Sequence, residues 1–156
     1  MDEAIIKFYR RLLKEDFPNA GELVQPTIFL EAIGGKLINC GNTGNYMQLY
    51  LYVVENRITN IKYLCSCEPV ANVAVEVFCT LVKEKTLVEV AGITEELFFQ
   101  VVETRDEGLG KKAWGLLDLL AEGIIRYKNM AGGIGPLVMD SHEKNGKESW
   151  DGVLST

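Results

Sequence analysis

The chain has 156 residues, of which 47% are apolar, and a formal net charge of −6 at pH 7. This length suits one domain of roughly 100–150 residues plus a tail, with enough apolar residues to build a core. The acidic balance argues against nucleic acid as the main partner, because phosphate binding needs a basic face.

The sequence predicts a cytoplasmic protein that does not enter a membrane. No apolar run approaches the roughly 20 residues that cross a bilayer. The first residues, Met1 to Glu3, lack a basic segment followed by an apolar one, so no export signal is expected. In a reducing cytosol, cysteines are expected to be free thiols, metal ligands or sulfur carriers rather than structural disulfides. The chain has four: Cys40, Cys65, Cys67 and Cys79.

The first predicted element is an amphipathic helix over residues 1–15, because apolar residues recur there with helical spacing. Its apolar face consists of Ile5, Phe8, Tyr9, Leu12 and Leu13. Turn residues follow at 17–21. Residues 26–33 then predict a first strand, which ends before Gly34.

Residues 45–54 alternate between apolar and polar or aromatic side chains, which predicts a strand. One side carries Met47, Leu49, Leu51 and Val53, and the other carries Tyr46, Gln48, Tyr50 and Tyr52. A tyrosine face of this kind typically packs against a helix or another chain. Residues 58–64 follow a short turn and are expected to pair back as a hairpin, which completes a three-stranded antiparallel sheet.

A helix is predicted from Pro69 to Lys83, with proline at the first helical position, where it is tolerated. Its expected buried face consists of Val70, Val73, Ala74, Val77 and Leu81, and its expected outer face of Asn72, Glu76, Thr80 and Lys83. Two short helices follow over residues 86–90 and 93–99, the second with Thr94 as its N-cap.

Glycines at 108 and 110 are expected to break the chain before a last helix, from Lys111 to about Lys128. Lys111 and Lys112 would then open this helix, where the helix dipole disfavours cations. Either they are solvated and balanced by nearby acidic residues, or they meet an anion or a carboxylate. Residues 129–156 have the composition of a flexible or surface-draped tail.

Cys65 and Cys67 stand where the second strand of the hairpin meets the helix that begins at Pro69. Their spacing puts both side chains on one face, and a helix N-terminus favours the thiolate form of a nearby cysteine. The alternative is that both are small buried residues at a structural joint. Cys40 lies in a glycine-rich segment that is either a ligand loop or a turn. The only histidine, His142, lies in the tail, which excludes a metal site built on two histidines.

Several local strings resemble the iron–sulfur cluster scaffold family, the IscU/NifU N-terminal-like proteins, over residues 1–128. Residues 15–21, Glu-Asp-Phe-Pro-Asn-Ala-Gly, resemble the family's Asn-Pro-x-Asn-x-Gly turn. Residues 44–49, Gly-Asn-Tyr-Met-Gln-Leu, resemble its Cys-Gly-Asp-x-Met-x-Leu segment, with Thr43 at the cysteine position. Residues 82–86, Val-Lys-Glu-Lys-Thr, resemble its Lys-Gly-Lys-Thr signature. Cys67, or else Cys65, falls on the second family cysteine, and Lys112 falls on the third.

The resemblance implies an α+β domain of the SufE/NifU kind: a three-stranded antiparallel sheet with helices packed on one side. It also implies a non-enzymatic scaffold that holds a 2Fe-2S cluster or zinc through cysteines, because such sites need soft thiolate ligands. Here the ligand set would be Cys67, Cys65 and Cys40. A cysteine desulfurase and iron–sulfur acceptor proteins would be its partners.

Two other functions fit the same residues. A sulfur acceptor similar to SufE shares this architecture and would carry persulfide sulfur on Cys67 without a metal. A non-catalytic interaction module would instead bind a partner through the tyrosine face and the tail.

Overall fold

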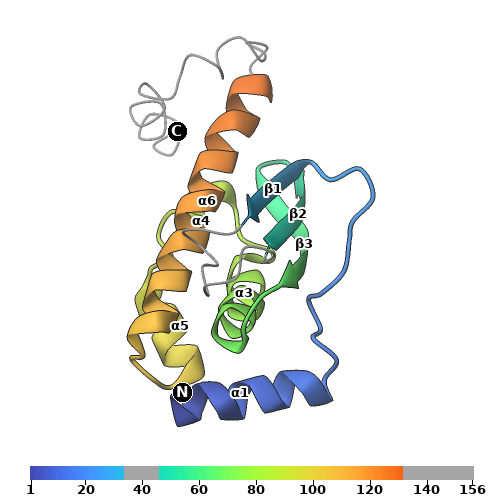
Figure 1. Cartoon of the computed structure of the whole chain (residues 1–156). Helices are drawn as coiled ribbons and strands as arrows, with labels where there is room; N and C mark the ends of the chain where they lie inside the picture. Colours follow the sequence, from blue (N-terminus) through green and yellow to red (C-terminus); the bar gives the residue numbers. More distant parts are fainter. Residues whose placement is uncertain (34–45, 132–156) are drawn as a thin grey trace.

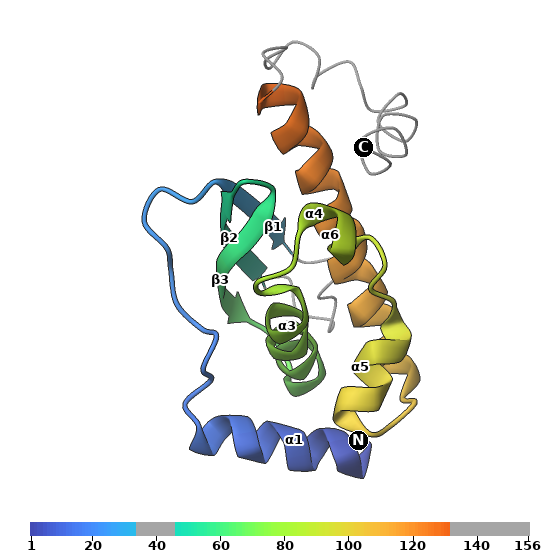
Figure 2. The same ribbon diagram turned by 180° about the vertical axis from the view of Figure 1, so that it is seen from behind.

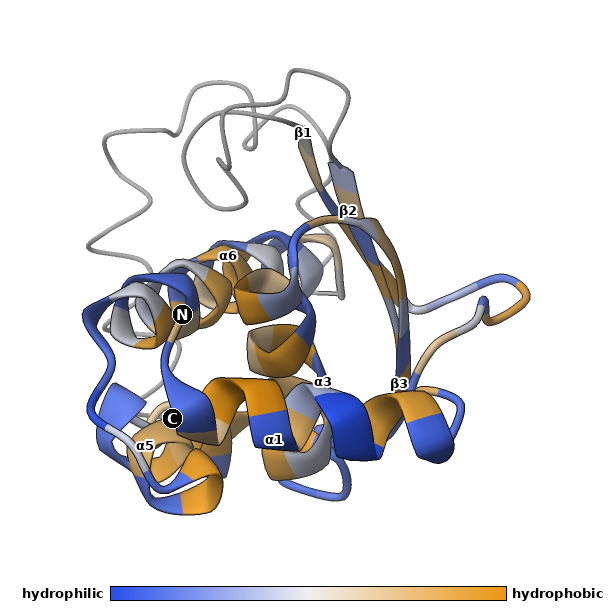
Figure 3. Cartoon of the chain, turned by 60° about the horizontal axis from the view of Figure 1, so that its bottom comes forward, coloured by the Kyte–Doolittle hydropathy of each residue, from blue (hydrophilic) through white to orange (hydrophobic). Residues whose placement is uncertain are grey.

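The computed structural model describes residues 1–33 and 46–131. A three-stranded antiparallel sheet forms one layer of the molecule, with the helices on one of its faces (Figures 1 and 3). Its strands are β1 (Ile28–Ile33), β2 (Tyr46–Val54) and β3 (Arg57–Ser66), in the order β1-β2-β3. The fold class predicted from the sequence is confirmed.

The hairpin of β2 and β3 has the side-chain alternation that the sequence predicts. The four apolar residues of β2 listed above are buried, and its three tyrosines and Gln48 are half-buried on the opposite face. Glu55 and Asn56 form the connecting turn with φ values of 52° and 61°, which match the two-residue turn that suits a twisted hairpin. β1 pairs with β2 in a register that sets Ile33 opposite Tyr46.

Five helices accompany the sheet in the described part of the chain. They are α1 (Glu3–Lys14), α3 (Pro69–Val82), α4 (Leu87–Val90), α5 (Glu95–Val102) and α6 (Glu107–Ala131). α3 lies against β3 and is also in contact with α1, α5 and α6, so it is the central helix (Figures 1 and 2). None of the helices in the described ranges is long and apolar enough to cross a membrane.

The helix ends follow ordinary capping chemistry. Asp2 caps α1 by accepting hydrogen bonds from the backbone N–H groups of Ala4 and Ile5, and it also accepts one from the Thr104 hydroxyl at 2.7 Å. Thr86 and Glu89 form a reciprocal capping box on α4. Thr94 occupies the N-cap position of α5, as predicted, but its side chain makes no capping hydrogen bond.

One prediction about α1 and one about α6 were wrong in detail. Leu13 is 53% exposed, because the buried face of α1 is narrower than its apolar residues suggest. The glycines at 108 and 110 do not break the chain, since α6 begins at Glu107 and Asp106 caps it through the N–H of Leu109. A Cβ at Gly110 would lie 2.9 Å from the Phe99 ring, so this glycine permits close packing of α6 on α5.

Candidate functional site: a Cys-x-Cys pair at a strand-to-helix junction

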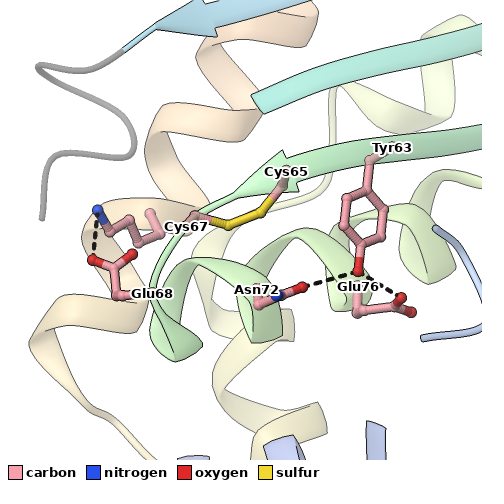
Figure 4. Close-up of a disulfide and its surroundings, with 7 residues drawn as sticks. Tyr63, Cys65, Cys67, Glu68, Asn72 and Glu76 are labelled. Carbon is pink, nitrogen blue, oxygen red and sulfur yellow. Dashed lines mark hydrogen bonds and ion pairs between the residues drawn. A yellow bond between two sulfur atoms is a disulfide. The ribbon is translucent and has the colours of Figure 1, made fainter. Parts of the chain in front are cut away.

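Cys65 and Cys67 lie where β3 ends and α3 begins, as the sequence predicts. β3 ends at Ser66 and α3 starts at Pro69, so the two cysteines lie on either side of the last strand residue. Both are half-buried and pack against the core, while Ser66 between them is exposed. Their side chains lie on one side of the junction (Figure 4).

The two cysteines form a disulfide in this structure, in place of the free thiols expected from the sequence. Their Cα atoms are 5.7 Å apart, within the range that a disulfide spans. Two residues of a straight strand would be farther apart, and the bend after β3 is what brings them together. The sulfur atoms are therefore direct neighbours in the folded chain.

Glu68 follows the pair at the N-cap position of α3, but its side chain makes no capping hydrogen bond. It turns instead to Lys112 of α6, whose Nζ lies 3.7 Å from Glu68 Oε2 (Figure 4). Glu68 Oε1 is buried and has no hydrogen-bond partner among the described residues. The carboxylate partner considered for Lys112 is thus Glu68, which sequence reasoning did not single out. Lys111 is 78% exposed and lies 4.0 Å from Glu107, as expected for a solvated lysine.

We expect Lys112→Ala to lower the free energy of unfolding by about 1 kcal/mol, because it leaves a partly buried carboxylate without its cation. Lys111→Ala is the matched control, and a change below about 0.5 kcal/mol is expected there, since exposed ion pairs contribute little. Urea unfolding followed by circular dichroism measures both. Equal effects of the two substitutions would contradict this role for Lys112.

A buried polar network lies beside the cysteine pair (Figure 4). Glu76 of α3 is only 2% exposed, although the sequence predicts it on the outer face of that helix. Its Oε2 accepts a hydrogen bond from the Tyr63 hydroxyl of β3 at 2.8 Å, and its Oε1 accepts one from the Asn19 side chain at 2.9 Å. The prediction failed because residues 19–21 pair with the open edge of β3 and cover this side of α3.

This network joins β3, which precedes the junction, to α3, which follows it. Tyr63 precedes Cys65 on β3, and Asn72 and Glu76 follow Cys67 on α3 (Figure 4). The Tyr63 hydroxyl also lies 2.9 Å from the side-chain oxygen of Asn72. Burial, reinforced by the Glu76 carboxylate, raises the pKa of Tyr63 far above its usual value, so the phenol keeps the proton that it donates.

Of the other two cysteines, Cys79 lies in the described part of the chain and Cys40 does not. Cys79 is completely buried in α3, and burial raises the pKa of its thiol well above the usual value, which makes it unreactive. Cys40 lies outside the described residues, as do Thr43 and His142. β1 precedes Cys40 and β2 follows it. The last residue of β1, Ile33, pairs with the first residue of β2, Tyr46, which in turn pairs with Ser66 at the end of β3. The chain therefore leaves and re-enters the sheet at the end that bears Cys65.

Within residues 1–33 and 46–131, no group of three or more histidine, cysteine, aspartate or glutamate side chains is arranged to hold a metal ion. The described part of the site consists of two cysteine sulfurs, one carboxylate and the lysine that neutralises it. Sulfur chemistry is possible with these groups alone. A metal site would need at least one further ligand.

No family model matches the chain, and no curated protein matches it. Solved structures do match the chain. The N-terminal part of a nitrogen-fixing NifU-like protein from Brucella abortus superimposes with a TM-score of 0.56 at 13% identity, over 82% of this chain and 94% of that one. A hypothetical protein matches with a TM-score of 0.53 at 14% identity, over 76% and 97%. A candidate iron–sulfur cluster assembly scaffold protein for the SUF system from Fervidobacterium islandicum AW-1 has a TM-score of 0.46 at 15% identity, over 76% and 79%.

The chain therefore has the fold of NifU-like N-terminal proteins, and the predicted resemblance is confirmed at the level of the fold. At 13% identity the similarity shows the arrangement of the sheet and helices and not the residues of the site.

Proposed function

We propose that this protein acts in iron–sulfur cluster assembly as a sulfur acceptor, with Cys67 taking persulfide sulfur from a cysteine desulfurase. The observation that carries the proposal is a partly accessible cysteine two residues before α3, in a chain with the fold of NifU-like N-terminal proteins. The Cys67 thiolate would attack the terminal sulfur of the desulfurase persulfide, the S–S bond of that persulfide would break, and the desulfurase cysteine would leave as a thiolate while Cys67 becomes a persulfide. The protein would be a stoichiometric carrier rather than an enzyme.

Local electrostatics support a thiolate at this position. The 14-residue helix α3 directs its partially positive N-terminus toward the segment that contains Cys67. The neighbouring Glu68 carboxylate would oppose a second negative charge, but Lys112 neutralises it at 3.7 Å. A reducing compartment, such as the cytoplasm predicted from the sequence, would keep the cysteine pair in the thiol form.

A second candidate is the scaffold function, in which Cys40, Cys65 and Cys67 hold a 2Fe-2S cluster or zinc as cargo for iron–sulfur acceptor proteins. Its support is the sheet register, because the strands on either side of Cys40 meet the end of β3 that bears Cys65. Thiolates are the soft ligands that such iron and zinc sites require. This site would need the disulfide reduced and Cys40 brought to the pair.

One experiment separates the two candidates. The reduced full-length chain is incubated anaerobically with a cysteine desulfurase and L-cysteine, and the sulfur on each cysteine is located by mass spectrometry. Cys65→Ser, which keeps Cys67, and Cys67→Ser, which keeps Cys65, are the matched pair. We expect stoichiometric persulfide on Cys67 in Cys65→Ser. In Cys67→Ser we expect at least tenfold less persulfide, since a hydroxyl cannot accept the sulfur.

A parallel incubation with ferrous iron, or with zinc, tests the scaffold function by visible spectrum and metal content. Stoichiometric metal that is lost in Cys40→Ser, without persulfide on Cys67 of the Cys65→Ser variant, would favour the scaffold over the sulfur acceptor. A Cys65→Ser protein without persulfide, together with a native protein without metal, would exclude both and leave the interaction module. Because all variants keep Cys79, which is buried, background labelling is the same in each.

A further inference from the structure

We propose that Cys65 is the resolving thiol of this site: it attacks the Cys67 persulfide, releases its outer sulfur as hydrosulfide, and leaves the Cys65–Cys67 disulfide. This inference rests on the proposed acceptance of sulfur by Cys67 and adds an activity to it. The protein would then deliver sulfide itself, the form of sulfur that cluster assembly consumes, instead of holding sulfur until an outside thiol removes it.

The geometry points to this step because the folded chain already holds the product arrangement. Cys65 and Cys67 are bonded to each other with their Cα atoms 5.7 Å apart, between a strand end and a helix start. The Tyr63–Glu76 hydrogen bond of 2.8 Å holds those two elements together. Positioning two reacting groups in this way replaces a bimolecular collision by an intramolecular one, which strongly accelerates the reaction.

The step balances without an outside reductant. The Cys65 thiolate attacks the inner sulfur, Sγ of Cys67, and the bond between that sulfur and the outer sulfur breaks. The outer sulfur leaves with the electron pair of that bond and takes the proton that Cys65 has lost, so the products are one hydrosulfide ion and one disulfide. Two electrons pass from the cysteine pair to the outer sulfur. A second round requires a dithiol reductant that reopens the disulfide.

Among the described residues, the other sulfur groups do not suit this role. Cys79 is completely buried within α3, so its thiol has no access to the site. The charges at the junction suit the departure of an anion, because the Glu68 carboxylate is already neutralised by Lys112. Cys40 lies outside the described residues, so the experiment removes it by substitution.

The test uses the full-length chain as Cys40→Ser, and as Cys40→Ser with Cys65→Ser. Each protein is reduced, freed of reductant, loaded anaerobically either by a cysteine desulfurase with L-cysteine or by inorganic polysulfide, and followed by intact mass and by sulfide assay. We expect Cys40→Ser to form the disulfide with stoichiometric hydrosulfide. The variant that also lacks Cys65 should retain the persulfide on Cys67, with release slowed about a hundredfold or more.

The outcomes separate this inference from the proposed function. Equal release of hydrosulfide from both proteins, or a persulfide that persists on Cys67 while Cys65 is present, would overturn it. So would transfer of the outer sulfur to Cys65 without release. If polysulfide-loaded Cys67 is resolved by Cys65 but the desulfurase loads neither protein, the resolving chemistry is supported and the proposed sulfur donor is wrong. Circular dichroism checks that both variants are folded.

Discussion

Glu76→Ala is expected to lower the free energy of unfolding by about 3 kcal/mol, because it removes a carboxylate that accepts three buried hydrogen bonds and leaves a cavity. The donors are the Tyr63 hydroxyl, at 2.8 Å, and the Asn19 side-chain amide, at 2.9 Å. The Asn19 backbone N–H, 3.2 Å from Oε2, also loses its acceptor. Urea unfolding followed by circular dichroism measures the change.

The matched control for this prediction is Glu122→Ala on the exposed side of α6, which should change the free energy of unfolding by less than about 0.5 kcal/mol. Glu76→Gln tests the chemistry with little change of shape. It keeps one acceptor oxygen but turns an NH₂ group toward one of the donors, so its cost should lie between those of the two alanine variants. A Glu76→Ala protein as stable as the control would show that the network is dispensable.

The same network predicts how stability depends on alkaline pH. The Tyr63 pKa is raised in the folded state, so above the ordinary tyrosine value of 10.0 the unfolded chain releases a proton that the folded chain keeps. The stabilisation is therefore complete below that value and is lost as the pH rises above it. Tyr63→Phe should reduce this alkaline loss, and unfolding curves across that pH range measure it.

Gly123→Ala is the second large effect, and its sign is opposite to that of most glycine-to-alanine changes in helices. A Cβ at Gly123 would lie 2.5 Å from Leu30 Cδ2 and 3.4 Å from Ile28 Cγ2, at the contact between α6 and β1. Leu30 is only 1% exposed, so it has little room to move. Overpacking is expected to outweigh the helix propensity gain of about 1 kcal/mol and to destabilise the fold by about 2 kcal/mol.

The contact that causes this effect can be removed separately. Leu30→Val lacks the clashing Cδ2 atom, so Gly123→Ala in a Leu30→Val background should cost much less than in the native chain, or should stabilise it. A double-mutant cycle from thermal or urea unfolding measures the coupling. No coupling between the two positions would mean that α6 does not lie on β1 as closely as the structure has it. This contact matters for the site because α6 carries Lys112 to Glu68.

Local patterns were enough to predict most elements of this chain. The alternation in β2 identified its buried face correctly, since that pattern depends only on neighbouring residues. Pro69 marked the first residue of α3 for the same reason. The position of the Cys65–Cys67 pair at the end of β3 followed from these two boundaries. Their direct bonding did not, because it depends on the bend that the chain makes between them.

What the sequence by itself determined is the order and type of the elements, and with them the place of the cysteine pair. Only the tertiary structure decided that Glu76 is buried, that α6 begins before its glycines, and that Glu68 meets Lys112. The physical reason is the distance along the sequence between the residues that interact. Periodicity, turns and caps are set by residues a few positions apart, whereas the burial or pairing of a polar side chain is set by distant elements that pack around it.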